Sequence, residues 1–197
     1  MKNRFFALLL LLVAPFAFAA EAYTTLKNPQ PVDDPSKIEV IEFFSFGCAH
    51  CAAFSASLAK WEKTLPADVV LRRIPVTFGR AAWTNVAKLY FTLESMGEYK
   101  RLEAKIFAAI HVNRVNLFVP NTMRDFLAKE GVDVEKFEAT FNSFGINSAI
   151  KRSDKMVNDY AIGGVPAMVV NGKYLFEGVG DDTLKEINAL IAKERKK

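Results

Sequence analysis

Cysteine and histidine are scarce in this chain of 197 residues. There are two cysteines, Cys48 and Cys51, and two histidines, His50 and His111. A tetrahedral zinc site needs four ligands, and three of these side chains crowd into one four-residue segment, so we expect no metal site. A disulfide between cysteines three residues apart closes too small a loop to stabilise the fold appreciably. A structural role for the pair is therefore the weaker interpretation, and an inert disulfide or buried thiol pair stays as an alternative.

Long apolar runs are absent after the N-terminus, and neither sign of charge dominates, since the formal net charge is +4. Lys2 and Arg4 precede an uncharged run over 5–20 that is shorter than the ~20 residues needed to span a bilayer. Ala17-Phe18-Ala19 has the small-x-small pattern of a signal-peptidase site. We therefore predict a cleaved secretory signal over 1–19, with a retained anchor as the alternative. Cleavage would lower the net charge to +2, which gives no reason to expect nucleic-acid binding.

The remaining composition is that of an ordinary globular protein, with 51% hydrophobic and 24% charged residues. Such a chain can bury a sizeable core, and we expect the mature protein to be soluble. Secretion would place the two cysteines in an oxidising compartment, where they are expected to pair. A chemical role for that pair then becomes the stronger interpretation.

The cysteines lie where an apolar strand gives way to a helix. Residues 38–46 are rich in β-branched and aromatic side chains, as expected of a buried or half-buried strand. After Cys51, the apolar side chains of Phe54, Leu58 and Trp61 recur with helical spacing. A helix N-terminus has unpaired N–H groups and the positive end of the helix dipole, which favour an anion. We expect that anion to be the thiolate of Cys48.

The predicted element order is β-α-β, a helical block over 79–161, and then β-β-α. Five amphipathic helices are expected in the block, with glycines such as Gly97, Gly131 and Gly145 ending helices. Asn171-Gly172 predicts a hairpin, and Asp181-Asp182-Thr183 predicts the cap of a last helix. A C-x-x-C pair at the first helix of such a pattern is typical of thioredoxin-like redox proteins.

We expect Cys48 to be the exposed, reactive cysteine and Cys51, one turn into the helix, to be shielded. A helix N-terminus or a nearby histidine can lower a thiol pKa from ~8.5 to well below neutrality. His50 can therefore stabilise the Cys48 thiolate, although an ordinary polar surface role is the alternative. A stable thiolate favours the reduced pair and makes the protein an oxidant. His111 lacks such a context and is expected to be structural or on the surface.

Two further positions are candidates for supporting roles. Strand alternation places Glu42 on a partly buried face, where a carboxyl with a raised pKa could exchange a proton with Cys51. Arg73 on the next strand could pair with Glu42, whereas a one-residue slip would turn Glu42 towards solvent at a sheet edge. Val165-Pro166 begins a later strand, so this peptide bond lies at an edge or is cis. A cis bond would leave the Val165 backbone free to pair with an extended peptide beside Cys48.

The sequence resembles the DsbA-type periplasmic thiol:disulfide oxidoreductases over nearly the whole mature chain. The similarity is carried by Tyr23-Thr24-Thr25-Leu26, by residues 42–51 and by residues 164–174. It implies an α/β thioredoxin fold, with residues 20–78 and 162–197 forming the thioredoxin-like domain and 79–161 an inserted helical domain. The chain departs from the common pattern at Ala49, where proline is usual, and at Arg73, where lysine is common.

The resemblance also implies a redox-active Cys48–Cys51 disulfide, a cis Val165–Pro166 bond and Glu42 as a buried acid. It implies no cofactor. The expected function is donation of disulfides to newly exported proteins, with reoxidation by a DsbB-like quinone-linked membrane protein. We expect a monomer located in the periplasm. The alternatives are a disulfide reductase or isomerase, and a peptide-binding chaperone whose disulfide is incidental.

Overall fold

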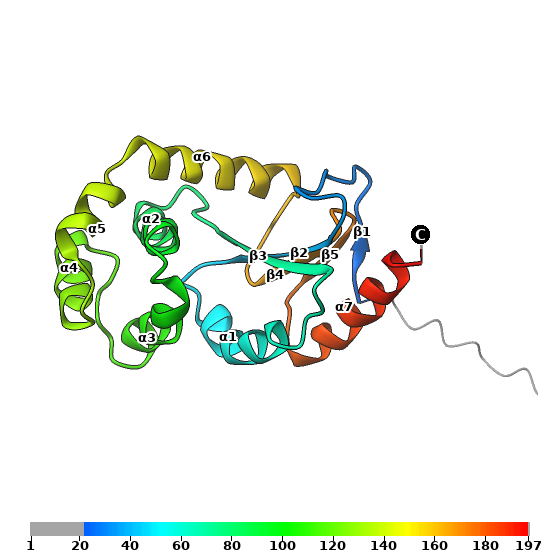
Figure 1. Cartoon of the computed structure of the whole chain (residues 1–197), viewed down its shortest axis with the longest axis horizontal. Helices are drawn as coiled ribbons and strands as arrows, with labels where there is room; N and C mark the ends of the chain where they lie inside the picture. The colour runs from blue at the N-terminus through cyan, green and yellow to red at the C-terminus, as the bar shows by residue number, and fades with distance from the viewer. Residues whose placement is uncertain (1–21, 197) are drawn as a thin grey trace, which may run out of the picture.

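The computed structural model describes residues 22–196, so the predicted signal over 1–19 lies outside the described residues. A five-stranded mixed sheet runs through the middle of the molecule in the order β1-β5-β4-β2-β3 (Figure 1). Strands β2 and β3 are parallel, and the other neighbours are antiparallel. The strands are β1 Thr24–Thr25, β2 Ile38–Phe44, β3 Val69–Pro75, β4 Ala167–Val170 and β5 Tyr174–Glu177.

Helices cover both faces of the sheet, and a group of them extends beyond one end (Figure 1). Helices α1 and α7 lie against one face, and α6 crosses the other. Helices α2 to α6 lie between β3 and β4 in the sequence, where the helical block was predicted. The helices are α1 Ala49–Glu62, α2 Ala81–Ser95, α3 Tyr99–His111, α4 Pro120–Lys129, α5 Val134–Phe141, α6 Phe144–Asp159 and α7 Asp181–Glu194.

Strand β2 is buried along its whole length, because helices pack on both sides of it. Val40 faces the α1 and α7 side, whereas Ile41 and Phe43 pack with α6 residues on the other. Phe44 and Phe46 continue into the core of the helical block. The segment that leads to Cys48 is thus held by all three parts of the core, which fixes where helix α1 begins.

One predicted helix boundary is wrong, and another is confirmed in part. Gly97 and Gly131 do end helices, with positive φ angles of 74° and 75°, but Gly145 lies in the first turn of α6. Ser143 begins that helix instead, since its side chain accepts a hydrogen bond from the Ile146 N–H. The predicted cap of α7 is confirmed in part, since its N-cap is Gly180 but the Thr183 side chain accepts a hydrogen bond from the Gly180 N–H at 3.0 Å.

The Asn171-Gly172 hairpin is confirmed. Both residues have positive φ angles, 50° and 65°, and they join the antiparallel strands β4 and β5. The turn also packs closely on the segment before β2, because Gln30 N–H donates to the Gly172 carbonyl at 2.9 Å. A Cβ atom on Gly172 would lie 2.0 Å from the Gln30 carbonyl oxygen, so glycine is required here for space as well as for its φ angle.

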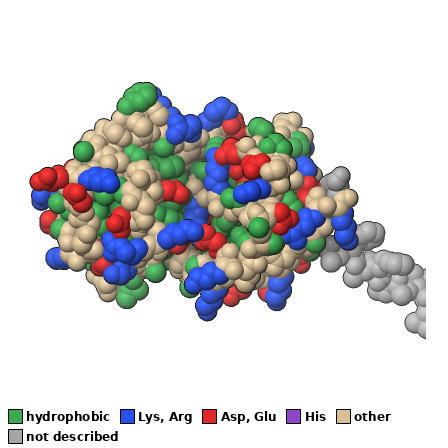
Figure 2. Space-filling model, viewed as in Figure 1, with side chains coloured by type: hydrophobic (Ala, Val, Ile, Leu, Met, Phe, Trp, Pro, Cys, Tyr) green, Lys and Arg blue, Asp and Glu red, His purple; other side chains and the backbone are tan. Residues whose placement is uncertain are grey.

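Acidic and basic side chains are interspersed over the face of the molecule shown in Figure 2. Among the helices of residues 22–196, none combines the length and the apolar character needed to cross a membrane.

Candidate active site

Cys48 is the N-cap residue of helix α1. Its φ and ψ angles of −97° and 118° are extended, and its Sγ accepts a hydrogen bond from the Cys51 N–H at 3.3 Å. The Cys48 N–H in turn donates to the Ser45 carbonyl oxygen at 3.0 Å. Both cysteines are free thiols in the structure. The strand-to-helix geometry that the sequence predicts therefore places the Cys48 sulfur where serine or aspartate oxygens commonly cap helices.

The two thiols differ strongly in acidity. A hydrogen bond from the Cys51 side chain lowers the pKa of Cys48 to about 6, against the opposing effect of burial. The N–H groups of Cys51 and His50 and the charge of His50 lower it further. The same hydrogen bond and burial raise the pKa of Cys51 far above its ordinary value. At neutral pH the reduced pair therefore holds one thiolate, on Cys48, and one proton, on Cys51.

Cys48 is less exposed than the sequence pattern predicts. It retains 8% of its surface and Cys51 retains none, so the order is as predicted but Cys48 is buried. The Val165 backbone lies against Cys48, since its carbonyl oxygen is 3.3 Å from the Cys48 Sγ, and Cys48 also belongs to the core cluster of the helical block. A carbonyl oxygen is an acceptor, so this contact suits the protonated thiol and opposes the thiolate. The Val165–Pro166 bond is cis, as the resemblance implies.

The two histidines lie on different elements near Cys48. His50 is exposed, and its charge and backbone N–H help to lower the pKa of Cys48. His111, at the end of α3, is half-buried, and its Nε2 lies 2.7 Å from the carbonyl oxygen of Phe46. This contact with the segment before Cys48 was missed, because no local sequence pattern pairs residues so far apart in the chain.

Gly47 allows the helical block to approach the cysteines closely. A Cβ atom at this position would lie 2.9 Å from the Trp83 Nε1 and 3.0 Å from a Phe118 ring carbon. Both aromatic side chains are partly buried and pack with the core that contains the cysteines. The residue before Cys48 therefore has to be small for the loop to lie against these rings.

Glu42 is buried beneath the cysteines, with 3% of its surface exposed. The solvent-facing alternative for this residue is therefore excluded. Arg73 lies opposite Glu42 in the β2–β3 register, and the Arg73 Nε is 3.2 Å from a Glu42 carboxylate oxygen. Burial raises the pKa of Glu42 to about 8, although the Arg73 charge opposes this shift. The charge of Glu42 also contributes to the raised pKa of Cys51.

Arg73 is shared among three carboxylates rather than paired with one. Besides Glu42, its guanidinium lies 2.8 Å from Glu62 of α1 and 3.5 Å from Glu103 of α3. Its charge also lies over the Tyr99 ring, 5.7 Å from the ring centre. No local sequence pattern identifies Glu62 and Glu103 as partners, since tertiary packing brings their helices, α1 and α3, to Arg73. Helical periodicity places both residues on helices, but it does not show which side of each helix faces Arg73.

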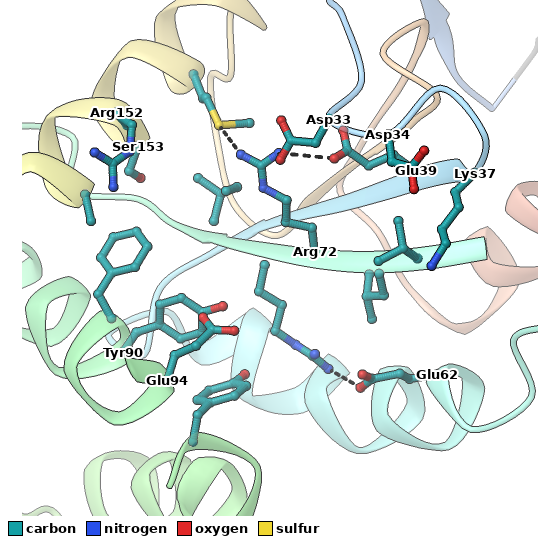
Figure 3. Close-up of a pocket in the computed structure, with 18 of the residues that line it drawn as sticks. Asp33, Asp34, Lys37, Glu39, Glu62, Arg72, Tyr90, Glu94, Arg152 and Ser153 are labelled. Atoms are coloured by element: carbon teal, nitrogen blue, oxygen red, sulfur yellow. Dashed lines mark hydrogen bonds and ion pairs between the residues drawn. The ribbon is translucent and has the colours of Figure 1, made fainter. Parts of the chain in front are cut away.

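Arg73 lies at the edge of a groove of about 880 Å³ that runs along the outer strand β3. Glu62, Tyr90 and Glu94 lie on one side of this strand, and Arg72 and Asp33 lie on the other (Figure 3). The cysteines do not line this groove. Within residues 22–196, no group of three or more His, Cys, Asp or Glu side chains is arranged to hold a metal ion.

Comparisons with known proteins identify the family. A family model described as a DSBA-like thioredoxin domain matches residues 39–192. The chain belongs to this family. The thiol:disulfide interchange protein DsbA of Pseudomonas aeruginosa is 42% identical over 207 aligned residues, covering 99% of this chain and 98% of that protein. DsbA of Bordetella parapertussis is 38% identical over 185 residues, covering 91% and 88%.

Solved structures of DsbA proteins have the same fold. The crystal structure of Pseudomonas aeruginosa DsbA matches this DsbA family member with a TM-score of 0.84 at 44% identity, covering 89% of this chain and 93% of that chain. DsbA of Xylella fastidiosa gives 0.82 at 30% identity, covering 89% and 96%. The predicted thioredoxin fold with an inserted helical region is confirmed. With its unequal thiols at a helix N-terminus, this DsbA family member is a thiol:disulfide oxidoreductase.

Proposed function

We propose that this protein is a dithiol oxidase, which donates a Cys48–Cys51 disulfide to exported proteins that fold in the periplasm. The observation that carries the proposal is that the pKa of Cys48 is lowered while the pKa of Cys51 is raised. A stable thiolate on Cys48 lowers the free energy of the reduced pair, and that makes the disulfide form a stronger oxidant. The proposal places residues 20–78 and 162–197 in the thioredoxin-like domain and 79–161 in the helical domain.

The first step is attack by a substrate thiolate on the Cys48 sulfur of the disulfide. The Cys48–Cys51 bond breaks, a mixed disulfide forms at Cys48, and the electron pair leaves on Cys51. Because the pKa of Cys51 is raised, this sulfur needs a proton at once. Glu42, whose pKa is about 8, still holds a proton at neutral pH and supplies it.

In the second step, another substrate thiolate attacks the substrate sulfur of the mixed disulfide. Cys48 leaves as a thiolate, and its pKa of about 6 makes it a good leaving group. The substrate gains a disulfide, and its two electrons remain on the cysteine pair. His50 stabilises the departing thiolate, while Arg73 holds the Glu42 carboxyl in place.

Val165 and Pro166 form the substrate-binding edge in this proposal. The Val165 carbonyl lies beside the Cys48 sulfur, where it could accept a hydrogen bond from the backbone of an extended peptide. Aromatic side chains such as Trp83 and Phe118 on the neighbouring helical block would add non-specific apolar contact. Such binding suits unfolded chains of varied sequence with free cysteines.

The reaction leaves a reduced enzyme, so a second partner must remove the electrons. We propose a DsbB-like membrane protein that passes them to a quinone, and that this monomeric protein needs no cofactor of its own. The periplasm fits an oxidase of this kind, since the homologues are DsbA proteins and the predicted N-terminal signal would direct export.

The redox equilibrium with glutathione tests the proposed direction of electron flow. Trp61 and Trp83 provide fluorescence signals, and a Cys51→Ala variant should accumulate mixed disulfides with a cysteine-containing peptide. A strongly reducing potential would instead indicate a reductase. A Cys48→Ala variant that still restores disulfide formation in cells lacking their oxidase would indicate a chaperone.

A further inference from the structure

The carboxyls around Arg73 are unequal in burial. The side chain of Glu42 is 4% exposed, that of Glu103 is 15% exposed, and that of Glu62 is 25% exposed. One guanidinium charge cannot neutralise three carboxylates, so at least one of them is favoured to stay protonated near neutral pH. The carboxyl least accessible to water is the one that loses most on ionising. That carboxyl is Glu42.

We propose that Glu62 and Glu103 are positioning residues, which draw the charge of Arg73 away from Glu42 and thereby keep the Glu42 carboxyl protonated at neutral pH. The inference rests on the proposed function in one respect, since it gives Glu42 the proton that Cys51 takes up. It assigns a task to two side chains that touch neither cysteine. Neither of them exchanges a proton with substrate.

The distances support this division of the Arg73 charge. The shortest contact of the guanidinium is to Glu62, at 2.8 Å, and it is a charge-assisted hydrogen bond. Glu42 and Glu103 both approach the single Nε atom, at 3.2 and 3.5 Å. The buried Nε makes no hydrogen bond to either of these carboxylates, whereas the Nη2 donates one to Glu62. Glu42 thus obtains only part of the pairing that would stabilise its charged form.

Further titratable groups lie around Arg73 and Glu42. Helix α3 also contributes Tyr99, whose ring lies against Arg73, and Lys100, whose Nζ lies 3.4 Å from Glu62. Lys100 is exposed and helps Glu62 stay ionised. The remaining titratable neighbours are Tyr90 and Glu94 on α2 and Cys48 and Cys51 on α1.

The pKa values of Glu42 and Glu62 are displaced in opposite directions, in accord with their burial and contacts. Burial raises the pKa of Glu42 to about 8, and the charges of Glu103 and Glu62 add to this rise. Burial also acts on Glu62, but hydrogen bonding and charge pairing with Arg73 outweigh it and lower the pKa of Glu62. The proton is thus concentrated on the carboxyl beneath Cys51. The negative charge is favoured on Glu62, which is nearer to water.

The test measures the titration of Glu42 directly, by carbon-13 NMR of glutamate carboxyls in the reduced full-length mature protein. A Glu42→Gln variant identifies the Glu42 signal. Removing one neighbouring negative charge from a partly buried site should lower the Glu42 midpoint by about one pH unit in Glu62→Gln and in Glu103→Gln. Glu62→Asp, which keeps the charge, should restore most of the original midpoint.

Glu98→Gln is the matched control, because Glu98 pairs with Arg101 on the surface of the same helical block. Its Glu42 midpoint should be unchanged. If both Glu62→Gln and Glu103→Gln also leave the midpoint unchanged, the inference is overturned. Two variants are used so that misfolding of one does not decide the result.

The rate of peptide oxidation against pH separates this inference from the proposed function. A lowered Glu42 midpoint with a matching shift of the rate profile to lower pH supports both. A lowered midpoint with an unchanged rate profile supports the positioning role of Glu62 and Glu103, but it refutes Glu42 as the proton donor to Cys51. The two ideas therefore fail on different observations.

Discussion

The stability of the reduced protein should rise with pH in a way that the disulfide form cannot reproduce. Folding lowers the pKa of Cys48 from an ordinary 9.0 to about 6. Between these values the folded protein carries a thiolate where the unfolded chain carries a thiol, so unfolding takes up a proton. The resulting stabilisation is complete above pH 9 and is lost as the pH falls through 6. The disulfide form has no thiol to titrate and lacks this contribution.

The expected size follows from the two pKa values. With one pKa unit equal to ~1.4 kcal/mol, the Cys48 contribution is close to zero at pH 5 and reaches about 1.4 kcal/mol at pH 7. Screening by water at the opening beside Cys48 reduces this to about 1 kcal/mol. Glu42 acts in the opposite direction, because its raised pKa gives stability that is lost as the pH rises through about 8. Glu42 is present in both redox forms, so its effect largely cancels in their difference.

Urea unfolding of the reduced and the disulfide forms at pH 5 and pH 7 measures this difference. The unfolding free energy of the reduced form, relative to the disulfide form, should increase by about 1 kcal/mol over that interval. The same increase should be absent in a reduced Cys48→Ala variant, which keeps Cys51 and Glu42. Parallel pH dependence in the two redox forms would refute the lowered pKa of Cys48, and the mechanism built on it would fail too.

Three further predictions follow from other contacts. The reduction potential should fall by about 59 mV per pH unit below pH 6 and by about 30 mV per pH unit above it. The slope changes because one proton fewer accompanies the two electrons once Cys48 is ionised. Equilibration with glutathione at several pH values measures this slope. His111→Ala should lower the unfolding free energy measured in urea by about 1 kcal/mol, since the Phe46 carbonyl oxygen loses its hydrogen-bond partner. An unchanged urea midpoint would show that this contact does not stabilise the active-site segment. Gly172→Ala should cost at least about 2 kcal/mol because of both φ strain and a backbone clash. Gly178→Ala, with positive φ but open space, should cost only about 1 kcal/mol, and equal losses would contradict the clash.

Local patterns predicted the parts of the site that are local in the chain. A strand, a C-x-x-C pair and an apolar helix face follow one another without interruption, so the placement of Cys48 at a helix N-terminus needed no tertiary information. The same holds for the Asn171-Gly172 turn, which depends on residues that tolerate positive φ. The pairing of Glu42 with Arg73 is less local, but a parallel register brings the two side chains together.

The errors and omissions have two different physical causes. Gly145 was assigned to a helix end because glycine often ends helices, whereas Ser143 caps the next helix two residues earlier. His111 and Glu103 were missed for another reason. Both lie on α3 and act on residues of the thioredoxin-like region, and the way a helix packs on a sheet end is decided by tertiary contacts. The contact of Val165 with Cys48 is of this second kind.

The hydrogen bond between the two cysteines links the chemistry of the thiols to that of the Glu42 carboxyl beneath them. The Cys51 thiol donates to the Cys48 sulfur, which makes Cys48 more acidic and Cys51 less acidic, so the two shifts are one interaction seen from its two ends. When the disulfide opens, the charge therefore stays on the sulfur at the helix N-terminus and the proton must go to the sulfur in the core. Water does not reach that sulfur, which retains none of its surface. In the proposed mechanism the buried Glu42 carboxyl supplies this proton, because burial raises its pKa to about 8 and the charges of Glu103 and Glu62 add to the rise.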